Sequence, residues 1–312
     1  MDPSVILRAM ALAATLAAAV VLILGWPWRA PNPTRAAIGW ALGIAAAVLV
    51  GSDALGLEPR WPPKQNQERF FVLVLPATVL AECLAAFPKL PRWLAWLARA
   101  AVAGGAARIL LHASVYLEDL EGSGSARWSA DEARLWLGGL AVALLVVWGG
   151  LGLLMRIAPS RSVPLALAVA CAGSALTVMI SGSISKGQLG LPLAAALVGA
   201  AAASFVAPMP RGAAPISIGL VGLYALLLGG HFFAELTWQH AALLFAAPLL
   251  CWVAVLPPFQ KLAPWLRGGL CILLVAIPVA VAGYQANKQS EENSRPPAGD
   301  SDDYEDYYRQ LR

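Results

Sequence analysis

The sequence predicts an all-α polytopic integral membrane protein, built as a bundle of about ten transmembrane helices. Of its 312 residues, 59% are hydrophobic and 13% are charged, against about 45–50% and about 25% in soluble domains. The hydrophobic residues form runs of about 20, the length that a membrane span needs. A soluble chain of this length could not cover its surface with 22 basic and 18 acidic side chains. Nucleic-acid binders, secreted disulfide scaffolds and ordinary cytosolic enzymes are therefore excluded.

Ten apolar segments follow one another with short loops between them. The first is longer than the apolar region of a signal peptide and ends in Trp26-Pro27-Trp28 rather than at a small-residue cleavage site, so we expect it to be retained. The third and fourth are separated only by residues 88–91, which begin and end with proline, so they form a tight hairpin. The expected spans are about 5–26, 35–56, 70–88, 92–117, 133–157, 162–184, 188–207, 213–233, 239–257 and 265–284.

Residues 1–284 therefore form one transmembrane helical domain, and residues 285–312 form an acidic C-terminal tail. The tail is polar and contains proline, so it cannot bury enough apolar area to fold alone, and we expect it to be disordered. The four cysteines lie inside apolar runs without a CxxC pattern, which is typical of small buried hydrophobic residues. They are Cys83, Cys171, Cys251 and Cys271.

The orientation follows from the basic residues of the loops. The loops after the odd-numbered spans contain Lys and Arg without any acidic residue, so we expect them in the cytoplasm and both termini outside. These basic residues are Arg29, Arg35, Lys89, Arg92, Arg156, Arg161, Arg211, Lys261 and Arg267. The bias toward Ala, Gly and Arg indicates a bacterial source of high GC content, and hence the plasma (inner) membrane.

A shift of 172 residues points to an internal repeat. It places Pro76 on Pro248 and aligns the motif Phe-x-Lys-Leu-x-x-Trp-Leu at 87–94 with the same motif at 259–266, without a gap. The repeat relates spans two to four with spans eight to ten. Because the related spans are six apart, they keep the same direction, as in a parallel repeat. The alternative is convergent use of Trp and Lys as anchors at the membrane surface.

Glu82 and Arg99 would both lie within the hydrocarbon region, where a charged side chain is costly. They are at similar distances from the hairpin turn on the two arms of the third and fourth spans, so at about 1.5 Å per residue they reach a similar depth. We predict a structural ion pair, with a proton or substrate relay as the alternative. The repeat agrees, because the matching positions are Ala254 and Cys271, so both charges are absent together.

Other polar side chains gather at the outer ends of the spans. On the fourth span Arg108, His112 and Tyr116 are four residues apart and share one helix face. They are expected to contact an anion or a lipid headgroup, or to lie at the membrane surface as ordinary interfacial residues.

On the eighth span His231 and Glu235 repeat the four-residue spacing, and Trp238 follows. An imidazole and a carboxylate one turn apart could orient a proton or supply two metal ligands. A metal site would need further ligands, for which Asp53, His112 and His240 are the candidates. There is no HExxH pattern, so no metal is predicted; an outward-facing polar binding site and a plain interfacial belt are the leading interpretations.

The sixth span has a stripe of small hydroxyl residues, Ser174, Thr177 and Ser181. Such residues usually mediate close helix packing in membranes, although they could also line a hydrophilic path. No His or Asp pattern accompanies them, so they do not indicate a serine nucleophile.

Three functional classes remain open from the sequence. Many spans, short loops and a potential duplication favour a transporter or permease of unknown substrate. The polar residues at the outer helix ends favour a scaffold or sensor subunit that binds a ligand, a lipid or another membrane protein. The third class is an intramembrane enzyme that uses His231 and Glu235. No catalytic residue or cofactor is assigned; the expected partners are the lipid bilayer and a small solute, lipid headgroup or membrane protein, and not nucleic acid.

Overall fold

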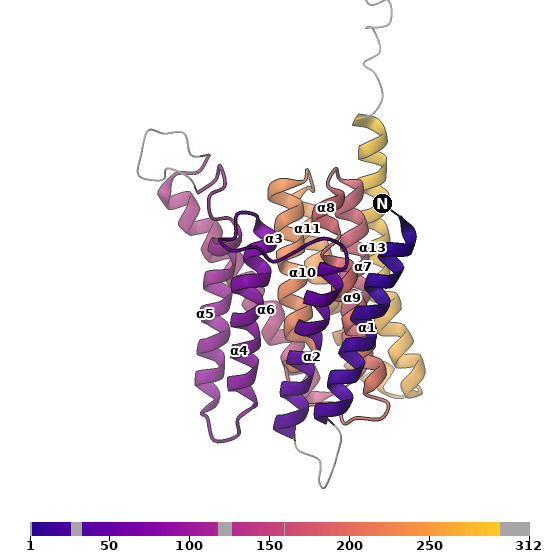
Figure 1. Cartoon of the computed structure of the whole chain (residues 1–312). Helices are drawn as coiled ribbons and strands as arrows, with labels where there is room; N and C mark the ends of the chain where they lie inside the picture. Colours follow the sequence, from indigo (N-terminus) through magenta and orange to yellow (C-terminus); the bar gives the residue numbers. More distant parts are fainter. Residues whose placement is uncertain (1, 26–32, 118–126, 159, 294–312) are drawn as a thin grey trace, which may run out of the picture.

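The structure is a computed structural model, and it describes residues 2–25, 33–117, 127–158 and 160–293. All regular secondary structure in these ranges is helical (Figure 1). Within them, nine stretches are long and apolar enough to cross a membrane. Five are single helices: α1 (Pro3–Gly25), α2 (Pro33–Asp53), α6 (Ala130–Ile157), α7 (Ser162–Ile180) and α10 (Ala214–Phe233). A sixth single helix, α13 (Pro264–Asn293), ends the bundle.

The other three stretches are interrupted. Asn66–Ala86 consists of α3 (Asn66–Arg69), the π-helix η1 (Phe70–Val74) and α4 (Leu75–Ala86). Ile184–Ala203 consists of α8 (Ile184–Gly187) and α9 (Gly190–Ala203). Trp238–Val255 consists of α11 (Trp238–Ala246) and the 3₁₀-helix η2 (Ala247–Val255), and the short α12 (Pro257–Gln260) follows it.

The remaining expected span corresponds to α5 (Arg92–Leu110), which is 19 residues long. It is not among the nine most apolar stretches, since Arg92, Arg99 and Arg108 lower its hydropathy. It stands beside α4 and runs the length of the bundle (Figure 1). α5 and the nine membrane-crossing stretches together make ten long helical segments in the described residues.

The start of α1 and the end of α13 lie at the same end of the bundle (Figure 1). We call this end the termini end, and the opposite end, where residues 87–91 join α4 to α5, the hairpin end. With α5 counted beside the nine stretches, the number of long helical segments in the described residues is even, which agrees with these two helix ends lying at the same end of the bundle.

The core of the bundle surrounds α10. Every residue of α10 from Ala214 to Gly230 is buried, as expected for a helix that is hydrophobic on all sides. α10 contacts α2, α4, α5, α6, α7 and α9. Small residues allow the neighbouring helices to approach closely: a Cβ atom added at Gly199 would lie 2.0 Å from the backbone oxygen of Ala14, and one added at Gly222 would lie 2.5 Å from Leu193.

The C-terminal boundary differs from the one expected. α13 continues to Asn293, so residues 285–293 are helical where the sequence led us to expect disorder. Two contacts explain this extension: Gln285 bonds to His240 of α11 at 2.7 Å, and Asn287 donates to Glu291 at 2.7 Å, one helical turn away. The rest of the expected tail, residues 294–312, lies outside the described residues.

The proposed internal repeat stays a prediction. The segment that would match α4 is η2, which is a 3₁₀-helix with Pro248 near its start, whereas α4 is an α-helix. The hairpin turn of residues 87–91 would match a turn that contains α12.

Candidate functional site

Glu82 and Arg99 meet inside the bundle. Arg99 Nε donates to Glu82 Oε1 at 2.8 Å, and Arg99 NH2 donates to Oε2 at 3.0 Å, so the pair is bidentate. The exposed fractions are 2% for Glu82 and 4% for Arg99. The guanidinium also lies 5.4 Å from the ring centre of Trp96 and 5.9 Å from that of Trp148. Both charges are thus satisfied within the protein, which is a structural arrangement.

Arg108, His112 and Tyr116 do not share a helix face, contrary to the sequence-based expectation. α5 ends at Leu110 rather than near residue 117, and His112 and Ala113 lie in a turn where Ala113 has φ +52°. The turn is held by Arg69 of α3, whose guanidinium donates to the backbone carbonyl of His112. The His112 carbonyl lies beyond the helix end, where no helical N–H group can reach it, and a buried arginine from another helix donates to it.

Tyr116 instead belongs to an aromatic cluster at the termini end. Its ring centre lies 4.9 Å from that of Trp128 and 5.0 Å from that of Phe232. Arg127 donates to the Tyr116 hydroxyl at 3.1 Å. His231 also contacts Phe232, with 4.7 Å between ring centres. Aromatic residues with polar tips are typical of the membrane surface.

His231 and Glu235 do not form the pair that their spacing indicated. α10 ends at Phe233, and Glu235 has φ +33° and an exposed side chain. The helical four-residue relation is therefore lost. His231 Nδ1 lies 2.7 Å from the backbone oxygen of Leu236.

The remaining candidate residues of this group are His240 and Trp238 of α11 and Asp53 at the end of α2. His240 bonds to Thr237 Oγ1 at 2.9 Å and to Gln285 Oε1 at 2.7 Å. Trp238 and Asp53 are exposed. Across the described ranges, no three His, Cys, Asp or Glu residues are grouped closely enough to hold a metal ion.

The hydroxyl stripe of α7 lies within packed helices. Thr177 donates to the Gly173 carbonyl at 2.8 Å, and Ser181 donates to the Thr177 carbonyl at 2.9 Å. Ser174 is fully buried and its hydroxyl has no hydrogen-bond partner in the described structure. A Cβ added at Gly173 would lie 1.9 Å from Val279 of α13, so α7 and α13 are in close contact at this level.

Sequence reasoning missed a polar cluster, which we call the α3 cluster: the buried Asn66, Gln67 and Arg69 of α3 and the half-buried Lys186 of α8. Lys186 of α8 donates to Asn66 Oδ1 at 2.7 Å, and Gln67 donates to the Ser185 carbonyl at 2.6 Å. Arg69 is 8% exposed and reaches the turn after α5, as described above. The cluster therefore joins α3, α8 and the end of α5. The sequence suggested that residues 58–69 form a loop. The capping box of Gln65 and Glu68, which marks the start of a helix, was the signal that could have predicted α3.

A polar pocket of about 150 Å³ opens beside the α3 cluster, and we call it the termini-end pocket. Arg60 and Glu58 form an ion pair at 3.7 Å on its rim. Glu68 accepts from the backbone N–H groups of Lys64 at 2.7 Å and Gln65 at 3.0 Å. The residues that line the termini-end pocket are Gly56, Leu57, Glu58, Arg60, Gln65, Gln67, Glu68 and Phe71.

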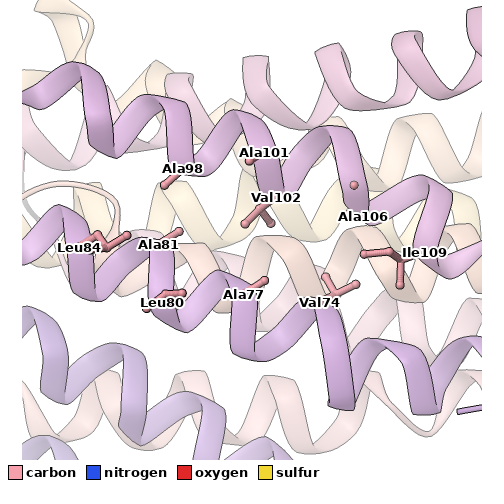
Figure 2. Close-up of a pocket in the computed structure, with 11 residues that line it drawn as sticks. Val74, Ala77, Leu80, Ala81, Leu84, Ala98, Ala101, Val102, Ala106 and Ile109 are labelled. Atoms are coloured by element: carbon pink, nitrogen blue, oxygen red, sulfur yellow. The ribbon is translucent and has the colours of Figure 1, made fainter. Parts of the chain in front are cut away.

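A second cavity, of about 280 Å³, lies between α4 and α5 and is almost wholly apolar (Figure 2). We call it the α4–α5 groove. None of His231, Glu235, Ser174, Thr177 or Ser181 lines either cavity.

No protein-family model matches the sequence, and a search of curated proteins finds no match. The fold itself shows a multi-pass, all-helical membrane protein.

Proposed function

We propose that this protein is a non-catalytic membrane sensor or scaffold subunit that binds a small polar ligand in the termini-end pocket. The observation behind this proposal is the identity of the pocket wall. Gln67 and Glu68 belong to α3 and Phe71 to η1, so one part of the wall is the beginning of a membrane-crossing stretch, and the segment between α2 and α3 forms the rest. A ligand there touches a transmembrane element directly.

The α3 cluster connects the pocket to other helices. Gln67 lines the pocket and at the same time donates to the Ser185 carbonyl. Its neighbours Asn66 and Arg69 bond to Lys186 and to the turn after α5. A shift of α3 on binding would therefore act on α8 and α5. The π-helix that follows α3 supports this role, because such segments are frequent at functional sites.

The chemistry of the pocket favours a small zwitterion. Two carboxylates (Glu58 and Glu68) can attract an ammonium group, and one guanidinium (Arg60) can attract a carboxylate or sulfonate. The two carboxamides, Gln65 and Gln67, supply further donors and acceptors. An amino acid has this combination of charges.

The tight interior favours binding at one face over passage through the bundle. α10 is buried from Ala214 to Gly230, and the hydroxyl groups of Thr177 and Ser181, at the C-terminal end of α7, donate to carbonyl groups of α7 itself. A transporter is the second candidate, because α8–α9 and α11–η2 are interrupted stretches, and discontinuous helices are typical of transporter sites. The intramembrane enzyme has no comparable support, since His231 and Glu235 do not meet.

The proposed orientation places the termini end outside the cell. In the sequence, the loops after the odd-numbered spans and the adjoining span ends contain nine Lys or Arg residues and no acidic residue, which is the pattern of cytoplasmic loops. The termini-end pocket would then face the periplasmic or extracellular side of a bacterial plasma membrane.

The test measures the thermal midpoint of the purified full-length protein in detergent, with the standard amino acids, taurine and glycine betaine as probes. At least one probe is expected to raise the midpoint, since a ligand at 100 times its Kd stabilises the folded state by about 2.7 kcal/mol. Arg60→Gln should lower the affinity for that probe about tenfold, as expected for the loss of about 1.4 kcal/mol from one charged hydrogen bond. The matched control is Arg134→Gln, an exposed arginine with a similar short-range ion pair outside the pocket, and it should leave the affinity unchanged.

The same probes are then tested for uptake into proteoliposomes. The sensor or scaffold proposal expects binding without flux. Flux of any probe through folded protein would overturn the sensor or scaffold proposal in favour of the transporter. If Arg60→Gln and Arg134→Gln changed probe binding equally, the termini-end pocket would not be the binding site.

A further inference from the structure

The α4–α5 groove is an open depression on the side of the hairpin that α4 and α5 form. Small residues form its floor on both helices, among them Ala77 and Ala81 of α4 and Ala98, Ala101 and Gly105 of α5 (Figure 2). Ala77 and Ala101 are exposed, so the groove faces the surroundings of the bundle. In a membrane protein those surroundings are hydrocarbon.

The ion pair lies beside one end of this space. Glu82 and Arg99 are next to the groove residues Ala81 and Ala98, but their side chains are buried, and the Arg99 guanidinium lies near Trp148. Six of the eleven groove residues are alanine or glycine, so short side chains leave the space between α4 and α5 open.

The dimensions of the groove fit one hydrocarbon chain. Its walls run from Val74 to Leu84 on α4, which is about 15 Å at 1.5 Å per residue. A volume of about 280 Å³ over that length corresponds to a cross-section of about 20 Å², whereas a helix about 10 Å across with its side chains needs about 80 Å². A single extended chain fits, since packed carbon atoms lie about 4 Å apart.

One end of the groove lies near the termini end of the bundle. This end, at Val74 and Ile109, is next to the last residue of α5. The other end is at Leu84, two residues before the last residue of α4, and at Ala98, six residues after the first residue of α5. A length of about 15 Å is half of the roughly 30 Å hydrocarbon core. An acyl chain that enters at the termini end would fill it.

The mouth of the groove is positively charged. Arg108 stands about one turn beyond Gly105 and two turns beyond Ala101 on the same side of α5, and its side chain is exposed. Among the described residues, no carboxylate forms an ion pair with Arg108. The buried guanidinium of Arg69 adds positive charge at the turn after α5. This charge complements a phosphate.

We propose that the α4–α5 groove holds one acyl chain of an anionic phospholipid from the termini-end leaflet, with Arg108 at its phosphate. This site is separate from the termini-end pocket and does not depend on the ligand proposed there.

The test uses full-length protein purified in mild detergent and native mass spectrometry with phosphatidylglycerol and phosphatidylcholine of the same chain length as probes. Gly105→Leu fills the groove, and Gly104→Leu is the matched control, because a Cβ at Gly104 meets open space outside the groove. Gly105→Leu should lower phosphatidylglycerol retention about tenfold, and Gly104→Leu should leave it unchanged. Ala101→Leu, which also lines the groove, provides a second filled variant if thermal denaturation shows that Gly105→Leu does not fold.

Arg108→Gln tests the headgroup contact. It should reduce the preference for phosphatidylglycerol over phosphatidylcholine about fivefold, which corresponds to the contribution of about one basic residue near an anionic lipid surface. Arg134→Gln is the control and should not change the preference. Equal lipid retention in Gly105→Leu and Gly104→Leu would overturn the site. So would a wild-type dimer that Gly105→Leu converts to a monomer with unchanged lipid, since the occupant would then be a second copy of the chain.

Discussion

At the residue scale, the buried Glu82–Arg99 pair links the two helices of the hairpin, α4 and α5. The bidentate geometry and the two tryptophan rings around the guanidinium satisfy the pair in an apolar setting. Removing one partner leaves an uncompensated buried charge, whereas removing both leaves none. The two residues should therefore be strongly coupled in stability.

The first prediction is a double-mutant cycle. Glu82→Leu and Arg99→Leu are each expected to lower the free energy of unfolding by about 3–5 kcal/mol, and the double variant that combines these two replacements should cost much less. Unfolding of the protein in mixed micelles measures this, with the coupling energy obtained from the cycle. Equal losses of stability in Glu82→Leu and in the double variant would show that the pairing contributes nothing.

The positions of the remaining candidate residues show what spacing alone can predict. The hairpin geometry correctly indicated that Glu82 and Arg99 reach one depth. The four-residue spacings of Arg108 with His112 and of His231 with Glu235 were misleading, because both helices end before the second residue. The turn after α5 receives a contact from another helix, from Arg69 to the His112 carbonyl, and no local pattern in α5 encodes that contact.

At the scale of elements, close helix packing depends on a few glycines. α1 and α9 approach so closely that a Cβ on Gly199 would lie 2.0 Å from the Ala14 backbone oxygen. Backbone cannot rotate away as a long side chain can, so the two helices would have to separate. Gly138 of α6, by contrast, faces open space.

The second prediction compares these two glycines. Gly199→Ala is expected to lower the free energy of unfolding by about 1–3 kcal/mol through overpacking, and Gly138→Ala should be neutral or stabilise the protein by about 0.5–1 kcal/mol through helix propensity. Thermal midpoints in one detergent compare the two variants. If both glycine replacements shift the midpoint alike, the close approach of α1 and α9 is not a source of stability.

At the scale of the whole molecule, the chain direction decides which face meets which compartment. Lys89 lies in the turn between α4 and α5, and Lys261 lies in the turn between α12 and α13, both at the hairpin end, whereas Arg127 lies three residues before α6 begins at the termini end. The loop charges favour the cytoplasm for the hairpin end.

The third prediction is the topology of the chain. In intact cells, a membrane-impermeant thiol reagent should label Arg127→Cys and should leave Lys89→Cys and Lys261→Cys unlabelled until the membrane is permeabilised. The wild-type protein controls for its own cysteines, of which Cys171, Cys251 and Cys271 are buried. Labelling at Lys89→Cys without labelling at Arg127→Cys would invert the proposed orientation and place the termini-end pocket in the cytoplasm.

The sequence by itself determined the class of the protein and the approximate place of its helices, because apolar runs of about 20 residues have one stable solution in a bilayer. It also determined the depth of the Glu82–Arg99 pair, since both residues are counted from one turn. Only the tertiary structure decided where α5 and α10 end, that α13 continues to Asn293, and that Asn66, Gln67 and Lys186 form a polar cluster. The turn after α5, the extension of α13 and the α3 cluster involve hydrogen bonds between residues more than 40 positions apart, and periodicity within one segment contains no information about such partners.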